Sequence, residues 1–104
     1  MRVSRLVLSD VAASDILEQA DWYAAHVGST LAERWDKAIT SALLRVIRNP
    51  AAGSPCRFRS PELNDVRRIA IRGFPKHLLF YRFCKQEVLV LRIVHGARDL
   101  ERLL

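Results

Sequence analysis

Three strand candidates near the end of the chain constrain the fold more than any other feature of the sequence. They occupy residues 65–72, 76–83 and 87–95, and the short connections Gly73 to Pro75 and Lys85-Gln86 lie between them. Connections this short join neighbouring strands as hairpins, so the runs predict three consecutive antiparallel strands. The second and third runs are almost entirely apolar, as expected for strands that are buried on both faces.

A helix is expected between residues 11 and 27. Ser9 is placed to cap its first turn, and Gly28 stands where a glycine commonly ends a helix. Apolar residues recur at the spacing of one helix face, which the sequence predicts to be Ala13, Leu17, Ala20, Tyr23, Ala24 and Val27.

A second helix is expected directly after the first. Thr30 and Glu33 form a capping-box pattern at its start, and Asn49-Pro50 ends it because proline cannot continue a helix. Its predicted apolar face is Leu31, Trp35, Ala38, Ile39, Ala42 and Val46. Two helices with so short a connection form an antiparallel hairpin, in which Trp22 and Trp35 are expected to be packing residues.

The order of elements predicts an α+β fold. With a short strand at 2–8 and a loop at 50–64, the order is strand, helix, helix, strand, strand, strand, followed by a possible short C-terminal helix. We therefore expect a small, antiparallel-dominated sheet with the helical hairpin packed on one face. A length of 104 residues suits one domain, so residues 1–104 are expected to form a single unit.

Charge is distributed unevenly along the chain. Residues 1–50 carry equal numbers of acidic and basic side chains, so the net charge of +6 belongs to residues 51–104. An acidic partner is therefore expected to meet the second half. The start of the chain lacks a signal-peptide pattern and no run is long enough to cross a membrane, so a cytoplasmic protein is expected.

Alternation along the strands suggests where the arginines lie. Successive side chains of a strand point to opposite faces, so Arg68 and Arg72 share a face, Arg82 lies with Phe80, and Arg92 lies with Val88 and Val90. If the uncharged sets lie under the helices, Arg68, Arg72, Arg82 and Arg92 line the other, open face of the sheet.

Single residues of the strands carry further expectations. Tyr81 belongs to an apolar set and is expected to be a core tyrosine with a bonded hydroxyl. Gly96 is expected to turn the chain at positive φ. His26, His77 and His95 are far apart in the sequence and are not expected to form one cluster.

No pattern in the chain indicates a cofactor or a metal. Cys56 and Cys84 stand alone, without metal-ligand spacing, and suit a reduced compartment. No Ser/His/Asp set or glycine-rich phosphate loop is present in the sequence. We therefore expect no cofactor and no metal site.

Four stretches together resemble one known superfamily. They are "LSDVAASDILEQADWYA" in the first helix, "RNPAAGSP" after the second, "LLFYRF" in the middle strand and "VLRIVHGARDLERLL" at the end. In this order and at these separations, the chain resembles the RelE/ParE-superfamily toxins of type II toxin–antitoxin systems, essentially from end to end. RelE-like members cut mRNA in the ribosome, whereas ParE-like members poison DNA gyrase.

The resemblance also separates these two activities residue by residue. RelE-like toxins supply two lysines, an arginine, a late arginine and a late tyrosine. By alignment, Arg68 and Arg98 fall at two of these five positions, and Ala70, Leu78 and Leu104 at the other three. Since alanine and leucine cannot transfer protons, no catalytic residue is favoured.

The resemblance therefore favours a ParE-like toxin that binds and inhibits DNA gyrase and is neutralised by a cognate antitoxin. Arg98, Arg102 and His95 are the candidates for binding the target. Arg68, Arg72, Arg82 and Arg92 are the candidates for binding an acidic, partly disordered antitoxin segment, which is expected to cover the sheet edge and the outer groove of the helical hairpin.

Two alternatives remain. The first is a ribosome-dependent mRNA endonuclease that uses Arg68, His95 and Arg98. The second is a non-toxic module that only binds an antitoxin.

Overall fold

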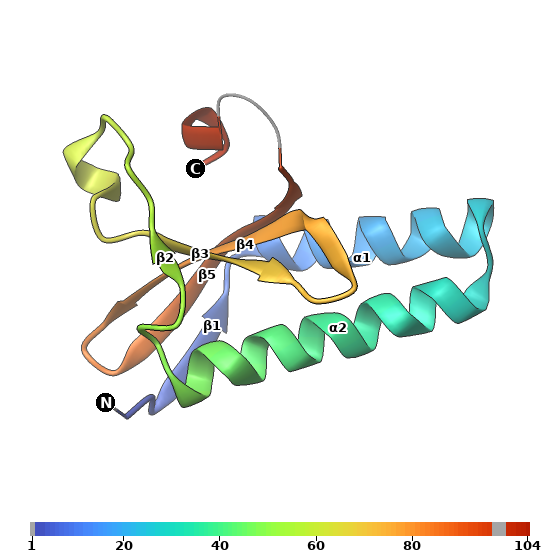
Figure 1. Ribbon diagram of the computed structural model, residues 1–104, viewed down its shortest axis with the longest axis horizontal. Helices are drawn as coiled ribbons and strands as arrows, with labels where there is room; N and C mark the ends of the chain where they lie inside the picture. Colours follow the sequence, from blue (N-terminus) through green and yellow to red (C-terminus); the bar gives the residue numbers. More distant parts are fainter. Residues whose placement is uncertain (1, 97–99) are drawn as a thin grey trace.

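The protein is a five-stranded sheet with two helices on one face. The computed structural model describes residues 2–96 and 100–104. The strands are β1 (Arg5–Leu8), β2 (Ser54–Pro55), β3 (Arg67–Ile71), β4 (Phe74–Cys84) and β5 (Glu87–His95). Their order in the sheet is β1-β5-β4-β3-β2, with β1 parallel to β5 and the other neighbours antiparallel (Figure 1). The predicted α+β fold is confirmed.

Helices α1 (Asp10–His26) and α2 (Ser29–Arg48) form the expected hairpin. Ser9 caps α1 as predicted, because its hydroxyl oxygen accepts the Ala12 N–H at 3.0 Å. The capping box at Thr30 is wrong: α2 already begins at Ser29, and Gly28, at φ 144°, is its N-cap without a side-chain bond. Only Val27 and Gly28 separate the helices, so Thr30 falls inside the first turn. Asn49 ends α2 as expected.

The face that α1 buries shares Ala20 and Tyr23 with the predicted one and differs from it elsewhere. Ala12 is fully buried and Ile16, Ala20 and Tyr23 pack against the core, while Leu17 and Val27 are 64% and 61% exposed. The predicted and the observed faces of α1 both carry apolar residues at helical spacing, so the spacing alone does not say which of them is buried. The rotation of α1 about its axis is set where Ser9, just before the helix, donates to the Leu91 carbonyl of β5 at 2.8 Å.

The two tryptophans have different environments. Trp35 of α2 is fully buried and its indole N–H donates to the Ile16 carbonyl at 3.1 Å, as expected of a packing residue. Trp22 is 51% exposed and stacks on His26 at the far end of α1, so it packs at the surface and not in the core. The buried residues of α2 agree with its predicted face.

The face of the sheet opposite the helices is covered rather than open. A second apolar cluster lies on it, formed by Cys56, Val66 and Phe80 with Phe58, Leu63, Leu78, Leu91, Val94, Leu100 and Leu104. The cover comes from 3₁₀ turns η1 (Pro61–Leu63) and η2 (Leu100–Leu103), both above the sheet in Figure 1. The loop predicted at 50–64 therefore also contains β2 and η1, whose few residues leave no periodic signal.

A β-bulge in β5 changes which residues share a face. Phe80 of β4 pairs with Arg92 but Tyr81 pairs with Val90, so Leu91 is an extra residue. Val88 and Val90 consequently lie in the core under the helices, on the opposite side from Arg92. The predicted grouping of Arg92 with these two valines is wrong, because strict alternation does not hold across a bulge.

The hairpin turns agree with the sequence in kind. Lys85 and Gln86 have φ of 51° and 64°, the two left-handed conformations of a type I′ turn, and Gly73 has φ of 87°. The expected positive φ of Gly96 is wrong. A Cβ atom at this position would make a tight contact of 3.2 Å with the Lys76 carbonyl oxygen. None of the described helices is both long and apolar enough to cross a membrane.

Candidate functional site

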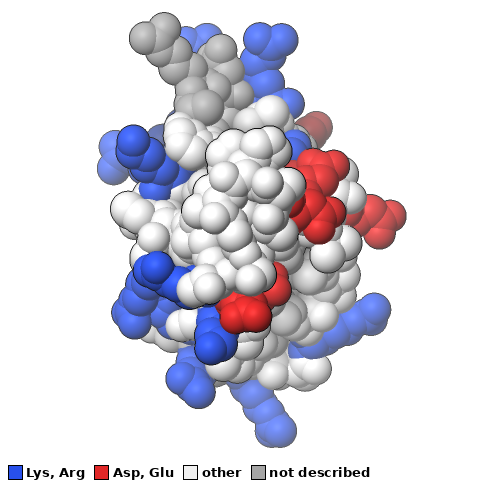
Figure 2. Space-filling view, turned by 90° about the vertical axis from the view of Figure 1, so that its right-hand side faces the viewer, with Lys and Arg blue, Asp and Glu red and all other residues white. Residues whose placement is uncertain are grey.

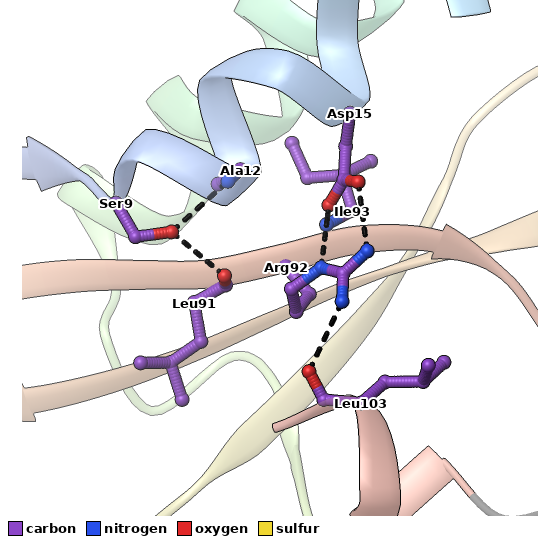
Figure 3. Close-up of polar contacts among 7 residues, drawn as sticks. All are labelled: Ser9, Ala12, Asp15, Leu91, Arg92, Ile93 and Leu103. Carbon is purple, nitrogen blue, oxygen red and sulfur yellow. Dashed lines mark hydrogen bonds and ion pairs between the residues drawn. The ribbon is translucent and has the colours of Figure 1, made fainter. Parts of the chain in front are cut away.

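Two of the four predicted sheet arginines are bonded within the molecule. The Arg92 guanidinium meets the Asp15 carboxylate through two contacts of 2.9 Å, and it also donates to the Leu103 carbonyl at 3.1 Å (Figure 3). Arg82 pairs with Asp65 at 3.0 Å and donates to the Glu62 carbonyl at 2.8 Å. Both arginines therefore hold elements of the fold together: α1 and the C-terminal turn in one case, η1 in the other.

The other two, Arg68 and Arg72, are exposed and lie near a third arginine that the sequence did not single out. Arg45, from the last turn of α2, donates to the Ala70 carbonyl of β3 at 2.9 Å. The three arginines line one groove of about 680 Å³ along the edge of β3. We call the three arginines, with the backbone of residues 69–71, the basic edge.

Charge at the basic edge is uncompensated within the described part of the chain. There the ion pairs involve Arg5, Arg82 and Arg92, and none involves an arginine of the basic edge. Burial lowers the pKa of the Arg45 guanidinium from its ordinary value, and the positive charge of Arg72 lowers it further. Such a site attracts an anion or a carboxylate group.

Tyr81 and Gly53 hold β2 in place beside the basic edge. The Tyr81 side chain is fully buried, and its hydroxyl donates to the Pro50 carbonyl at 2.7 Å and accepts the Gly53 N–H at 2.9 Å, which confirms the expected core tyrosine. A Cβ atom at Gly53 would lie 2.6 Å from that hydroxyl oxygen. This tie brings the chain after α2 against β3 as the two-residue strand β2.

A second groove lies between α1 and the ends of β4 and β5. Its volume is about 790 Å³, and its lining includes Trp22, Tyr23, Phe74, His77 and His95. The two histidines are directly opposite each other in the sheet, with ring centroids 5.3 Å apart. The expectation that the histidines are dispersed is therefore wrong for this pair, because strand pairing brings together residues that are distant in sequence.

The histidine pair has an asymmetric environment. His77 is 8% exposed and its ring packs against Trp35, whereas His95 is exposed. Burial lowers the pKa of His77, and the neighbouring His95 adds to this effect. Among the described residues, no three His, Cys, Asp or Glu side chains form a group that could hold a metal ion.

The structure separates Arg68 and His95, the two residues of the nuclease alternative that it describes. Arg68 pairs with Phe80, whose side chain lies in the cluster away from the helices. His95 pairs with His77 and lines the groove on the helix side, so Arg68 and His95 lie on opposite faces of the sheet. Ala70 and Leu78 pair with each other beside Arg68 and offer no proton-transferring group.

The three candidate target-binding residues are only partly described. His95 ends β5 and Arg102 lies on η2, and both are exposed. Arg98, like Asp99, is outside the described residues.

Figure 2 views the molecule from the end of the helical hairpin. On this side lysine and arginine lie mainly around the margin, with aspartate and glutamate in separate patches and an uncharged area between.

Comparisons with known proteins agree on the kind of fold. The family model described as the ParE toxin of the type II toxin–antitoxin system, parDE, matches residues 6–100. A chain of the chromosomal ParDE toxin–antitoxin system from P. aeruginosa superposes with a TM-score of 0.73 and 22% identity, covering 93% of this chain and 98% of the other.

A double arginine-to-alanine mutant of the E. coli toxin RelE, in the free state, superposes with a TM-score of 0.61 and 18% identity over 100% of both chains. No curated protein sequence matches the chain significantly.

Proposed function

The chain belongs to the ParE toxin family of type II toxin–antitoxin systems, and on this premise we propose that it inhibits DNA gyrase by binding and is neutralised by a cognate antitoxin. Residues 1–104 act as one unit in this proposal. The toxin works by docking on its target and not by cleaving RNA, so no chemical step is assigned to a side chain.

The separation of Arg68 and His95 on opposite faces of the sheet is the observation that carries the choice of gyrase over the ribosome. Cleavage of RNA requires a base for the 2′-hydroxyl, a cation for the phosphorane and an acid for the leaving oxygen, all around one phosphate. Arg68 has Ala70 and Leu78 as its neighbours on the far face, and neither can act as an acid or a base.

Antitoxin binding is supported by two surfaces. Arg68 and Arg72 belong to the basic edge, which suits the acidic segment expected of an antitoxin. The helical hairpin has exposed apolar side chains, namely Val11 and Leu17 on α1, Val27 just after it and Leu44 on α2, which suit the apolar face of a partner. Arg82 and Arg92 enter the proposal as residues that maintain the fold around these surfaces.

Two assays on the same purified protein test the proposed target. The first measures DNA supercoiling by gyrase and the accumulation of cleaved plasmid. The second measures cleavage of translated mRNA at the ribosomal A site. The proposal expects inhibited supercoiling with intact mRNA. Cleaved mRNA with unaffected gyrase would support the RelE-like alternative, and inactivity in both assays would support the antitoxin-binding module.

Variants of the three candidate contact residues test where gyrase is bound. Arg98→Ala, Arg102→Ala and His95→Ala are each expected to weaken inhibition of supercoiling. Arg57→Ala is the matched control, because Arg57 is an exposed arginine on the loop before η1. Equal inhibition by all four variants would exclude these three residues as the gyrase-binding surface.

A further inference from the structure

The groove between α1 and the ends of β4 and β5 has the size of a small-molecule site. Its volume is about 790 Å³, and ligand pockets commonly measure roughly 300–1,000 Å³. One wall is a stripe of α1 that runs from Asp15 to Tyr23, and residues 74–77 and 93–95 form the rest. The ion pair of Asp15 with Arg92 holds this helix against the sheet, so the groove is pre-formed.

Aromatic rings form much of this groove. The ring of Phe74 lies 5.6 Å from that of Tyr23 and 6.4 Å from that of His77, measured between centroids. The indole of Trp22 lies beside Tyr23, at 5.8 Å, and Trp22 is 51% exposed. Aromatic rings bury an apolar body, and their faces attract positive charge. The rings therefore suit a ligand that combines an apolar body with a cationic group.

Glu18 adds a negative charge to the aromatic lining. It is exposed, and none of the ion pairs among the described residues involves it. The second carboxylate of the groove, Asp15, is neutralised by Arg92. Glu18 and Trp22 are four residues apart on α1, so they are neighbours on the helix surface. A cation that pairs with Glu18 therefore lies beside the indole.

His77 adds a buried hydrogen-bond acceptor. It is 8% exposed, and its Nε2–H donates to the Gln19 amide oxygen at 3.4 Å. Burial lowers the pKa of His77, which favours the neutral ring, and a neutral imidazole carries one N–H. With the proton on Nε2, Nδ1 presents a lone pair, and in the described part of the chain it has no hydrogen-bond partner. This lone pair accepts N–H groups and disfavours an anion.

We propose that this groove binds a small organic cation, namely a primary amine on an aromatic body. The ammonium group pairs with the Glu18 carboxylate beside Trp22, and the aromatic body packs on Tyr23 and Phe74. The lone pair of His77 accepts an N–H group of the ligand. The inference goes beyond the proposed function and does not rest on it, because none of these residues is among the proposed contacts with gyrase or the antitoxin.

The charge of the ligand is the decisive point. Lys76 lines the opposite wall of the groove, and its positive charge would favour an anion. An anion in the groove, however, would lie near the Glu18 carboxylate and the lone pair of His77. The head group of the ligand therefore separates the inference from its opposite.

The test compares three molecules that share a biphenyl body: biphenylmethylamine is cationic, biphenylmethanol is neutral and biphenylcarboxylate is anionic. Each is titrated into the nitrogen-labelled protein at constant pH and salt. NMR follows the indole N–H of Trp22, which the variant Trp22→Phe assigns. The amine is expected to shift this signal saturably, with a dissociation constant on the order of 100 μM for a ligand of its size. The alcohol should bind roughly tenfold more weakly, and the carboxylate should give no saturable shift.

Variants locate the ammonium group and the aromatic body. Glu18→Gln is expected to weaken binding of the amine roughly threefold, as for an exposed ion pair, and to leave binding of the alcohol unchanged. Asp21→Asn is the matched control, because Asp21 is an exposed carboxylate of the same helix outside the groove lining. Trp22→Ala, followed at the backbone N–H of His95, should weaken binding of both molecules. Urea unfolding of each variant shows whether it is folded before affinities are compared.

The inference is wrong if none of the three molecules gives a saturable shift, or if Glu18→Gln and the parent protein bind the amine equally. Tighter binding of the carboxylate than of the amine would make the groove an anion site at Lys76. Shifts confined to exposed apolar residues of the helical hairpin, such as Leu17 and Val27, would show adsorption of the biphenyl body outside the groove. Either of these two results would also overturn the inference.

Discussion

Asp15 of α1 and Arg92 of β5 form a two-contact ion pair in which both distances are 2.9 Å. Asp15 also accepts the Ile93 N–H at 3.0 Å, so one carboxylate satisfies a guanidinium and a backbone donor of β5 (Figure 3). β1 pairs with β5 only as far as Val90. Beyond that residue β1 no longer pairs with β5, and Asp15 of α1 accepts the backbone N–H of Ile93 instead.

Removing this carboxylate is expected to destabilise the protein. The side chains of Arg92 and Asp15 are only 21% and 11% exposed, so Asp15→Ala leaves the two guanidinium N–H groups that faced Asp15, and the Ile93 backbone N–H, without their acceptor. The expected loss is about 3 kcal/mol in the free energy of unfolding, measured by urea denaturation. Asp21→Ala, at an exposed position of the same helix, should change it by less than about 0.5 kcal/mol. Equal stability of the two variants would contradict the role of the pair.

Tyr81→Phe tests the tie that places β2. The change removes one donor and one acceptor in a fully buried site and leaves the Pro50 carbonyl and the Gly53 N–H without their partner. We expect a loss of about 1–3 kcal/mol, read from urea denaturation. Tyr23→Phe keeps the aromatic packing against Trp35 and serves as the matched control. A smaller loss for Tyr81→Phe than for the control would count against the tie.

Acid is expected to destabilise the fold through His77. Burial and the nearby His95 lower the pKa of His77 below the ordinary 6.5. The unfolded chain therefore binds a proton at this residue at a higher pH than the folded chain does. Stability is full above pH 6.5 and is lost as the pH falls from there through the lowered pKa of His77.

The measurement is the urea midpoint as a function of pH. His77→Gln should flatten the dependence below pH 6.5, whatever its effect on stability at neutral pH. The groups that face His77 in the groove, Asp15, Glu18, Lys76 and His95, are unchanged in this variant. His26→Gln, at an exposed histidine of α1, should keep the slope of the parent protein. An unchanged slope in His77→Gln would refute the assignment.

Tryptophan fluorescence tests the orientation of α1. Trp35→Phe leaves Trp22 as the single tryptophan, and its 51% exposure predicts strong quenching by acrylamide. Trp22→Phe leaves the fully buried Trp35, which should be protected in the folded protein and quenched in urea. If both variants are protected equally, Trp22 is buried and α1 is not oriented as in the structure.

The local structure was predictable wherever one residue type settles the conformation. Ser9 determined the start of α1, Asn49-Pro50 the end of α2, and Lys85-Gln86 the turn between β4 and β5. Caps, proline and short turns depend on neighbouring residues alone. The sequence thus determined the α+β class, the helical hairpin and the terminal antiparallel strands.

Tertiary structure decided the rest. The bulge at Leu91 depends on the exact register of β4 and β5. The contact of His77 with His95 and the approach of Arg45 to β3 join residues that are far apart in the sequence. Periodicity predicts how far apart the apolar residues of an element lie, but not which side of a helix is buried or how two strands are aligned. Packing therefore decided which side chains of α1 and β5 face the core. For the same reason, the candidate site includes an arginine from a helix that strand alternation could not indicate.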